Sequence, residues 1–189
     1  MGAFKPLLPF GHQTVIESCI DYLRKAGVET IIVVVGHRAA ELKNRLCHLP
    51  LTFALNPDPE TQMSASITAA LPKVPTTGAL LIALADYPAV PSSVVTTLIS
   101  EWQKGAPLII PTWQHRGGHP VLIDLRYRDE LQNLDPARGL RALFAAHPDK
   151  VKRVPVDSPY IARDMDTWDD YSALYKEVFG EPPPERRVD

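Results

Sequence analysis

An aspartate stands at the end of the most apolar strand-like run in the chain, LIALADYPAV. Pro88 fixes the turn behind Asp86, so we expect the run to be a buried strand that points this carboxylate into a crevice at its end. A hard cation such as Mg²⁺ takes carboxylate oxygens and usually keeps several waters. A simple turn hydrogen bond is an equally good interpretation of the same residue.

A second acidic stretch, DMDTWDDY, offers four more carboxylates around the start of an expected helix. Thr167 followed by Asp170 is close to a capping box, so Asp169 and Asp170 are interpreted as helix-start residues. Capping does not account for Asp164 and Asp166, which precede the cap. We expect these two on an extended segment with their side chains on opposite sides, one as a metal ligand and the other structural.

The stretch NPDPETQMSASI places an amide at a strand end and two hydroxyls at a helix start. Asn56, Ser64 and Ser66 could together bind an anion or a ribose, because exposed amides at helix N-termini favour such ligands. Ordinary helix capping is the alternative, and it accounts for one of the serines without any ligand.

Two further stretches carry glycines beside a possible ligand-binding side chain. In RGGHPVLI, glycines including Gly118 permit close backbone approach, and His119 could donate to a phosphate. Spacing alone favours a plain hairpin turn with an internally bonded histidine. In the opening MGAFKPLLPFGH, Lys5 could neutralise phosphates, although a lone surface lysine usually has no such role.

The elements that must position these residues alternate between helical periodicity and continuous apolar runs. Runs such as TIIVVVG lack polar alternation, which is typical of strands covered on both faces. The alternation predicts an α/β layered fold, with one domain over residues 1–179 and a Pro-rich tail over 180–189. Helices are expected at 13–27, 38–49, 64–71, 92–105, 126–134, 137–147 and 167–180, and strands at 30–36, 51–55, 78–86, 106–113, 119–125 and 150–156.

Composition excludes several function classes. The 189 residues carry a formal net charge of −2, so no broad basic field is present and nucleic acid is not an expected partner. No apolar run is long enough to span a membrane. Cys19 and Cys47 lie in apolar helix-like segments and are interpreted as small buried hydrophobes in a reducing compartment. We therefore expect a cytoplasmic protein with no membrane partner.

Four of these stretches, in this order, resemble the MobA-like nucleotidyltransferases of molybdenum-cofactor maturation, and the resemblance is closest to the MocA type, the molybdenum cofactor cytidylyltransferases. MGAFKPLLPFG is similar to the end of that family's signature, LADYP to its LADQP, RGGHPVL to its RGHPVL, and DMDTWDDY to its DIDTPEDY. Tyr87 replaces the usual Gln and Trp168 the common Pro. The order of motifs agrees to about Phe179.

The resemblance implies a Rossmann-like three-layer fold of the nucleotide-diphospho-sugar transferase type, with a mostly parallel sheet. It implies Mg²⁺-dependent transfer of a nucleotide, from CTP or GTP, to the phosphate of a molybdopterin-type acceptor, and a molybdoenzyme or its chaperone as a further partner. The residue roles that it implies are catalysis by Lys5 and Asp86, nucleotide binding by Lys5, Asn56, Ser64, Ser66 and Asp86, acceptor binding by Gly118 and His119, and metal binding by Asp86 and Asp166.

In the family a first strand and a Gly-rich turn stand before the opening loop, and the sequence as given has neither. A late gene start, a fragment and a loss of activity are all compatible with this difference. Two alternative functions therefore remain open: a sugar-phosphate nucleotidyltransferase on the same fold, and a truncated, non-catalytic cofactor-binding protein.

Overall fold

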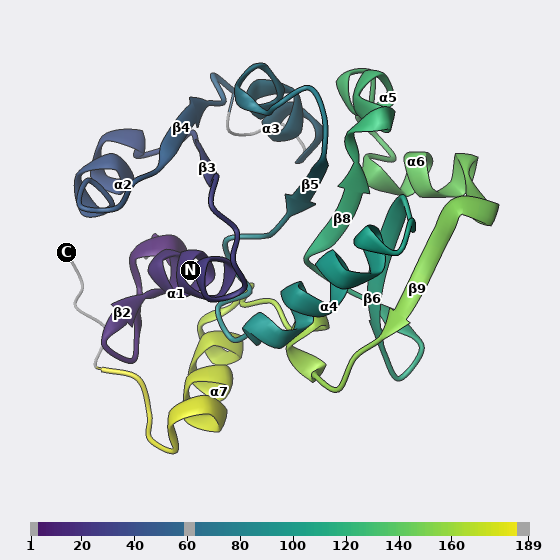
Figure 1. Cartoon of the computed structure of the whole chain (residues 1–189). Coiled ribbons are helices and arrows are strands. Elements are labelled where there is room, and N and C mark those ends of the chain that lie inside the picture. Colours follow the sequence, from purple (N-terminus) through teal and green to yellow (C-terminus); the bar gives the residue numbers. More distant parts are fainter. Residues whose placement is uncertain (1–3, 59–62, 185–189) are drawn as a thin grey trace.

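The computed structural model describes residues 4–58 and 63–184 (Figure 1). Helices and strands alternate along most of the chain, as the sequence predicts. The helices are α1 (Val15–Lys25), α2 (Ala39–Arg45), α3 (Met63–Ala70), α4 (Ser92–Gln103), α5 (Arg128–Gln132), α6 (Leu140–Ala146) and α7 (Trp168–Phe179). The strands are β1 (Pro9–Phe10), β2 (Gln13–Thr14), β3 (Ile32–Val35), β4 (Thr52–Leu55), β5 (Ala79–Ile82), β6 (Leu108–Trp113), β7 (Arg116–Gly117), β8 (Val121–Asp124) and β9 (Val151–Pro155). Short 3-10 helices include η1 (Lys5–Leu7) and η5 (Pro159–Ala162).

The strands of the described residues form two main sheets. β3 and β4 pair in parallel as a two-stranded sheet, with Ile32 opposite Thr52. The larger sheet has the order β5-β8-β6-β9, with the short β7 as a hairpin on β6. β6 and β9 are parallel, whereas β8 runs antiparallel to both β5 and β6, so it is the returning strand that the sequence indicates. β5, β6 and β9 therefore share one direction.

Helices cover both sheets, and their apolar residues make up the core. Ile16 and Ile20 of α1 pack with Val33 and Val35 of β3, while a separate cluster joins α4 to β6, β8 and β9. The start of α1 is a capping box, in which the Thr14 backbone N–H and hydroxyl both donate to the Glu17 carboxylate at 2.8 Å.

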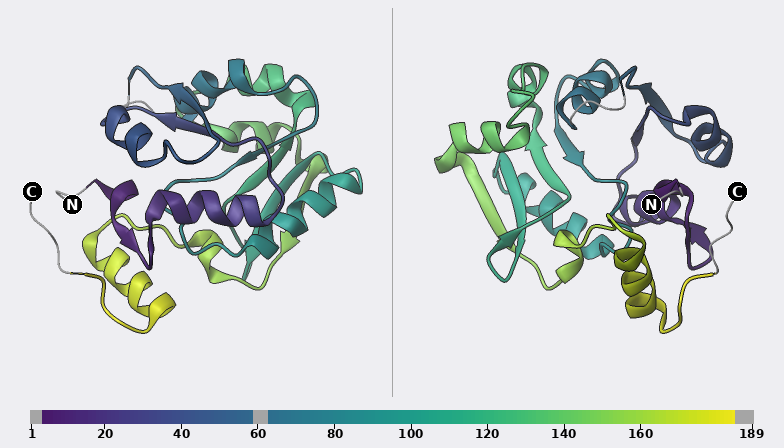
Figure 2. Two further views of the ribbon diagram at one scale, coloured as in Figure 1. Left: turned by 60° about the vertical axis from the view of Figure 1, so that its left-hand side comes forward. Right: turned by 180° about the vertical axis from the view of Figure 1, so that it is seen from behind.

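The opening loop is held by the last helix, although the two lie at opposite ends of the sequence (Figure 2). Phe10 packs against Tyr171 and Tyr175 of α7, and the Tyr171 hydroxyl donates to the Pro9 carbonyl oxygen at 2.7 Å. Gly11 takes a left-handed φ of +64°, and a Cβ there would lie 2.8 Å from the Phe179 ring. This packing fixes where Lys5 lies.

Two sequence expectations are wrong in detail. The strand expected at 78–86 ends at Ile82, where the ladder with β8 stops, and Asp86 lies in the turn beyond it. Cys19 is buried as expected, but Cys47 is exposed: it lies beyond the end of α2 at Arg45, where Leu46 and not the cysteine packs into the core. No helix among the described residues is long and apolar enough to cross a membrane. The end of the expected tail, residues 185–189, lies outside the described part.

Candidate functional site

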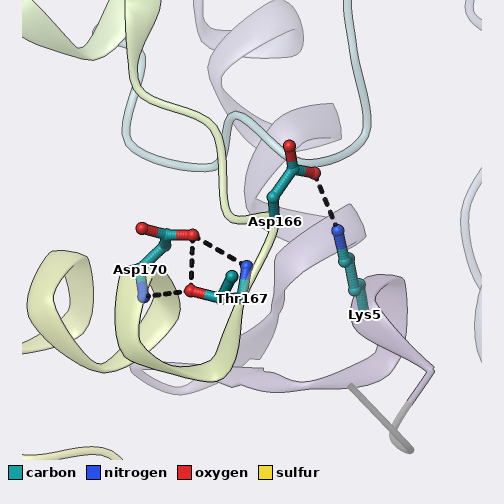
Figure 3. Close-up of polar contacts among 4 residues, drawn as sticks. All are labelled: Lys5, Asp166, Thr167 and Asp170. Carbon is teal, nitrogen blue, oxygen red and sulfur yellow. Dashed lines mark hydrogen bonds and ion pairs between the residues drawn. The ribbon is translucent and has the colours of Figure 1, made fainter.

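The opening loop and the segment before α7 meet through one ion pair. The Lys5 ammonium donates to Asp166 Oδ1 at 3.0 Å (Figure 3). The lysine side chain is 31% exposed and the aspartate side chain 71% exposed, so the pair faces solvent. Exposed pairs of this kind add little stability, which leaves both groups available to a charged ligand.

The segment is fixed just beyond this pair by the predicted capping box (Figure 3). The Thr167 N–H donates to Asp170 Oδ2 at 2.8 Å, and the Asp170 N–H donates to Thr167 Oγ1 at 3.1 Å. Hydrogen bonds from the Thr167 hydroxyl and backbone lower the pKa of Asp170. The interpretation of Asp170 as a helix-start residue is confirmed.

Asp86 lies close enough to this pair to interact with it electrostatically. Burial raises the pKa of the Asp86 carboxyl; the Lys5 charge opposes that shift, and the Asp164 and Asp166 charges add to it. The expectation that Asp164 and Asp166 point to opposite sides is wrong. Both are exposed, whereas Met165 between them is fully buried, because residues two apart on an extended chain share a side.

These carboxylates are suitable ligands for a hard divalent cation. Mg²⁺ is commonly held by one or two carboxylates together with waters and substrate phosphate oxygens. Asp86 and Asp166 supply that donor type, and Lys5 beside them supplies a positive charge for phosphate. In the described residues no group of three or more Asp, Glu, His and Cys side chains is arranged to hold a metal ion.

Two of the residues predicted to hold the nucleoside, Asn56 and Ser66, are hydrogen bonded to each other. The Asn56 side-chain amide donates to Ser66 Oγ at 3.1 Å, and its oxygen accepts from the Asp58 N–H at 3.1 Å. Asn56 is only 6% exposed, and its backbone N–H donates to the Val35 carbonyl at the end of β3. Ser64 is buried in the first turn of α3.

On the expected acceptor side, the hairpin turn is present and His119 lies next to the end of β5. His119 Nδ1 is 3.4 Å from the Ile82 carbonyl oxygen, and burial lowers the pKa of its imidazole. Gly118 is required by packing, since a Cβ there would lie 2.0 Å from the Ile161 carbonyl oxygen in η5. Packing is therefore one reason for glycine at this position, and the role of Gly118 in acceptor binding stays a prediction.

Sequence reasoning gave no role to Tyr87, which lies between the carboxylate group around Asp86 and the histidine on the expected acceptor side. Its ring centroid is 6.0 Å from that of His119, and it follows Asp86 directly in the chain. Burial, with added repulsion from Asp164, Asp86 and Asp166, raises the pKa of the Tyr87 hydroxyl to about 12. The signal was visible in the sequence as the replacement of Gln by Tyr within LADYP.

The candidate residues gather at one edge of the two sheets. Asn56 follows β4, Asp86 follows β5, and His119 precedes the antiparallel β8, whose Val121 pairs with Ile82 at the end of β5. In open α/β sheets, ligands bind outside the carboxyl ends of the strands. The structure is therefore an α/β protein with polar side chains at the edge where ligands bind in folds of this class.

The chain belongs to the MobA-like NTP transferase domain family, whose sequence profile matches residues 1–152. This match confirms the resemblance drawn from the motifs. Among curated proteins, the chain is similar to nicotine blue oxidoreductase of Paenarthrobacter nicotinovorans, with 23% identity over 175 residues that cover 86% of this chain and 83% of the relative.

Solved structures agree on the fold. Rv0371c from Mycobacterium tuberculosis H37Rv superposes with a TM-score of 0.83 at 26% identity, covering 93% of this chain and 90% of that one. A nucleotidyl transferase from Methanothermobacter thermautotroptrophicus has a TM-score of 0.80 at 23% identity, covering 94% and 86%. Rv0371c has also been solved as a complex with manganese. The nucleotide-diphospho-sugar transferase type of fold is thereby confirmed.

Proposed function

We propose that this protein transfers CMP from CTP to the phosphate of a molybdopterin-type acceptor and releases pyrophosphate. An acceptor phosphate oxygen forms a bond to the α-phosphorus as the bond to the pyrophosphate oxygen breaks. A phosphate is already ionised at neutral pH, so the reaction needs charge neutralisation and positioning rather than a strong base. The observation that carries the proposal is the Lys5–Asp166 ion pair beside Asp86 in a MobA-like domain.

Each residue has one task in this proposal. Lys5 neutralises the nucleotide phosphates, and Asp86 and Asp166 hold a divalent cation. When bound, that cation supplies charge neutralisation at the phosphates. The Lys5 ammonium, which is paired with Asp166 at 3.0 Å and is 31% exposed, would lie within reach of phosphates bound beside that carboxylate. The manganese complex of a protein with the same fold supports a divalent cation in this role.

Other residues would bind the nucleoside and the acceptor. Asn56, Ser64 and Ser66 orient the nucleoside from the ends of β4 and α3, and His119 lines the acceptor side next to Tyr87. His119 binds as a neutral imidazole at neutral pH, because burial lowers its pKa. A molybdoenzyme or its chaperone is the further partner that would receive the product.

Two other functions compete with this one. The name of the curated relative from Paenarthrobacter favours an oxidoreductase as a second candidate. A sugar-phosphate nucleotidyltransferase would use the same metal centre with a different acceptor. An oxidoreductase would consume a redox partner and release no pyrophosphate. A sugar-phosphate nucleotidyltransferase would bind a sugar phosphate in competition with the pterin.

The test is pyrophosphate release and product formation with molybdopterin, using CTP or GTP and Mg²⁺ or Mn²⁺. We expect metal-dependent product from CTP, a strong loss in Asp86→Asn, and no loss in Asp169→Asn, a helix-start control from the same acidic stretch. A sugar phosphate that displaces the pterin would select the runner-up transferase. Absence of any nucleotidyl product from the folded protein would overturn the proposal.

A further inference from the structure

Asp86 lies in an irregular connection, which extends over residues 83–91 between β5 and α4. Figure 1 shows α1 beside this connection, and hydrogen bonds join the two. A side chain on irregular backbone is held only as precisely as the contacts of that backbone allow. The contacts between α1 and the connection therefore bear on how well the Asp86 carboxylate is placed.

Two neighbouring side chains of α1 bond to the connection on either side of Asp86. The Ser18 hydroxyl donates to the Pro88 carbonyl oxygen at 2.8 Å. The buried Cys19 thiol donates to the Leu84 carbonyl oxygen, with 3.7 Å between sulfur and oxygen, and is the weaker donor. Leu84 and Pro88 each lie two positions from Asp86, so α1 brackets the turn that carries the carboxylate.

The Ser18 hydrogen bond differs from the usual one made by a hydroxyl in a helix. Such hydroxyls commonly donate to the carbonyl four residues earlier, as Thr97 does to Ser93 at 2.8 Å in α4. Ser18 instead reaches a carbonyl 70 positions later in the chain, and the bond is partly buried. Because water competes less for a partly buried bond than for an exposed one, this bond is suited to fixing the connection against α1.

Tyr22 contacts the same region through packing. It follows Ser18 by four residues, so it lies on the same face of α1. Its ring belongs to an apolar cluster with Val90, Val94 and the partly buried Tyr87. Among residues 4–58 and 63–184, the buried Tyr22 hydroxyl has no hydrogen-bond partner. Tyr22 therefore holds the connection by apolar contact, whereas Ser18 holds it by a hydrogen bond.

We propose that Ser18 is a positioning residue, whose hydrogen bond to the Pro88 carbonyl fixes the turn so that the Asp86 carboxylate can bind a divalent cation. Ser18 acts through the backbone of the turn and not by contact with the ligand. Loss of its hydroxyl should leave the fold intact and let the turn move, because the apolar packing of Tyr22 remains. The inference rests on the proposed function, since that function supplies the cation.

The test compares Mn²⁺ affinity, measured by electron paramagnetic resonance, in the wild type, Ser18→Ala and Ser18→Thr. Loss of a group that supports a metal ligand commonly lowers affinity by about 10–100-fold. We expect Ser18→Ala to weaken Mn²⁺ binding by about 10-fold, at the lower end of that range, because Ser18 holds the backbone rather than the carboxylate itself. Ser18→Thr keeps a hydroxyl at this position and should bind Mn²⁺ as tightly as the wild type.

Two variants control for a simple loss of stability. Thr97→Ala removes a hydroxyl-to-carbonyl bond of the same 2.8 Å length that lies within α4. Tyr22→Phe removes, from the Ser18 face of α1, a hydroxyl that has no partner in the described part of the chain. Both should bind Mn²⁺ as the wild type does. An equal loss of affinity in Thr97→Ala and Ser18→Ala would overturn the proposal.

Hydrogen exchange of the metal-free protein tests the same role without the cation. We expect Ser18→Ala to speed exchange of the amides of residues 85–87 and to leave exchange in β5 unchanged. Unchanged exchange at residues 85–87 would overturn the proposal. The titration also separates the two ways to fail. A wild type that binds no Mn²⁺ would overturn the proposed metal centre, whereas tight binding that is the same in Ser18→Ala would overturn only the role of Ser18.

Discussion

The two halves of the candidate site differ in how their polar groups are used. Asn56 is buried and hydrogen bonded to Ser66 and to the backbone of Asp58. Asp86 is half-buried and interacts electrostatically with two other carboxylates, and Lys5 supplies an opposing positive charge. The polar atoms of Asn56 thus have hydrogen-bond partners within the protein, whereas the carboxylates around Asp86 carry an excess of negative charge.

This difference separates structural from chemical roles. A group whose hydrogen bonds are made internally stabilises the fold, so its removal lowers the free energy of unfolding. A buried carboxylate near like charges destabilises the fold and persists where a cation or proton is to be bound. Substitutions should therefore affect stability on one side of the site and ligand binding on the other.

The largest effect on stability is expected at Gly118, whose close packing against Ile161 gives it a structural role like that of Asn56. Gly118→Ala puts a Cβ 2.0 Å from the Ile161 carbonyl oxygen, so the backbone must shift. We expect a loss of at least about 1–3 kcal/mol of unfolding free energy, measured by urea denaturation. Gly117→Ala is the control, because its Cβ would meet the movable Ile110 side chain at 3.1 Å. An unchanged unfolding midpoint together with lost acceptor binding would instead assign Gly118 to the ligand.

Asn56→Ala should have the next largest effect. It removes the hydrogen bonds to Ser66 Oγ and to the Asp58 N–H inside the protein, at a cost of about 1–3 kcal/mol. Asn133→Ala is the matched control, because Asn133 makes its side-chain hydrogen bond, to the Asp129 carbonyl, at the surface. Thermal melts of both variants compare the two costs. Equal losses of Tm in Asn56→Ala and Asn133→Ala would contradict the structural role assigned to Asn56.

Asp86→Asn should raise stability at neutral pH. Burial raises the pKa of Asp86 in the folded protein, so the folded state binds this proton more tightly than the unfolded state. The wild type therefore loses stability as pH rises from the unfolded pKa of about 3.9 through the raised folded value. We expect the variant to melt higher at pH 7, with a difference that shrinks toward zero below about pH 4. A variant that melts lower at pH 7 would show that Asp86 is structural.

The smallest effect on stability is expected for Lys5→Met. Loss of an ion pair whose partners are 31% and 71% exposed should cost no more than about 1 kcal/mol. The pKa of Asp86 should rise further, since the Lys5 charge lowers it in the wild type. An NMR titration of the Asp86 carboxyl group measures that rise. A titration curve that does not move would place Lys5 outside the site.

Local sequence patterns predicted most elements, because apolar periodicity and capping residues act within a few positions. The capping box at Thr167 and Asp170 is an example, since both partners lie within one helical turn. The end of β5 was misplaced because the apolar run continues to Ala85 after the ladder stops at Ile82. That end depends on where β8 begins, which a local pattern does not contain.

Sequence motifs predicted which residues lie near one another better than they predicted the contacts that hold those residues in place. The motifs predicted that Lys5, Asp86 and Asp166 lie near one another, and the Lys5–Asp166 ion pair and its electrostatic interaction with Asp86 agree with this. Their roles in metal binding and catalysis stay predictions. The reason for Gly118 depends on contact with Ile161, which is remote in sequence. The hydrogen bond of Asn56 to Ser66 likewise needs β4 and α3 to be packed together.

The central claim is that Asp86 and Asp166 bind a divalent cation, and Mn²⁺ titration followed by electron paramagnetic resonance tests it most directly. Loss of groups that support a metal ligand commonly costs 10–100-fold in affinity, so we predict that Asp86→Asn weakens Mn²⁺ binding by at least about 10-fold. Asp166→Asn should weaken it as well, and Asp169→Asn should match the wild type. Equal Mn²⁺ affinity in the wild type and Asp86→Asn would contradict the account.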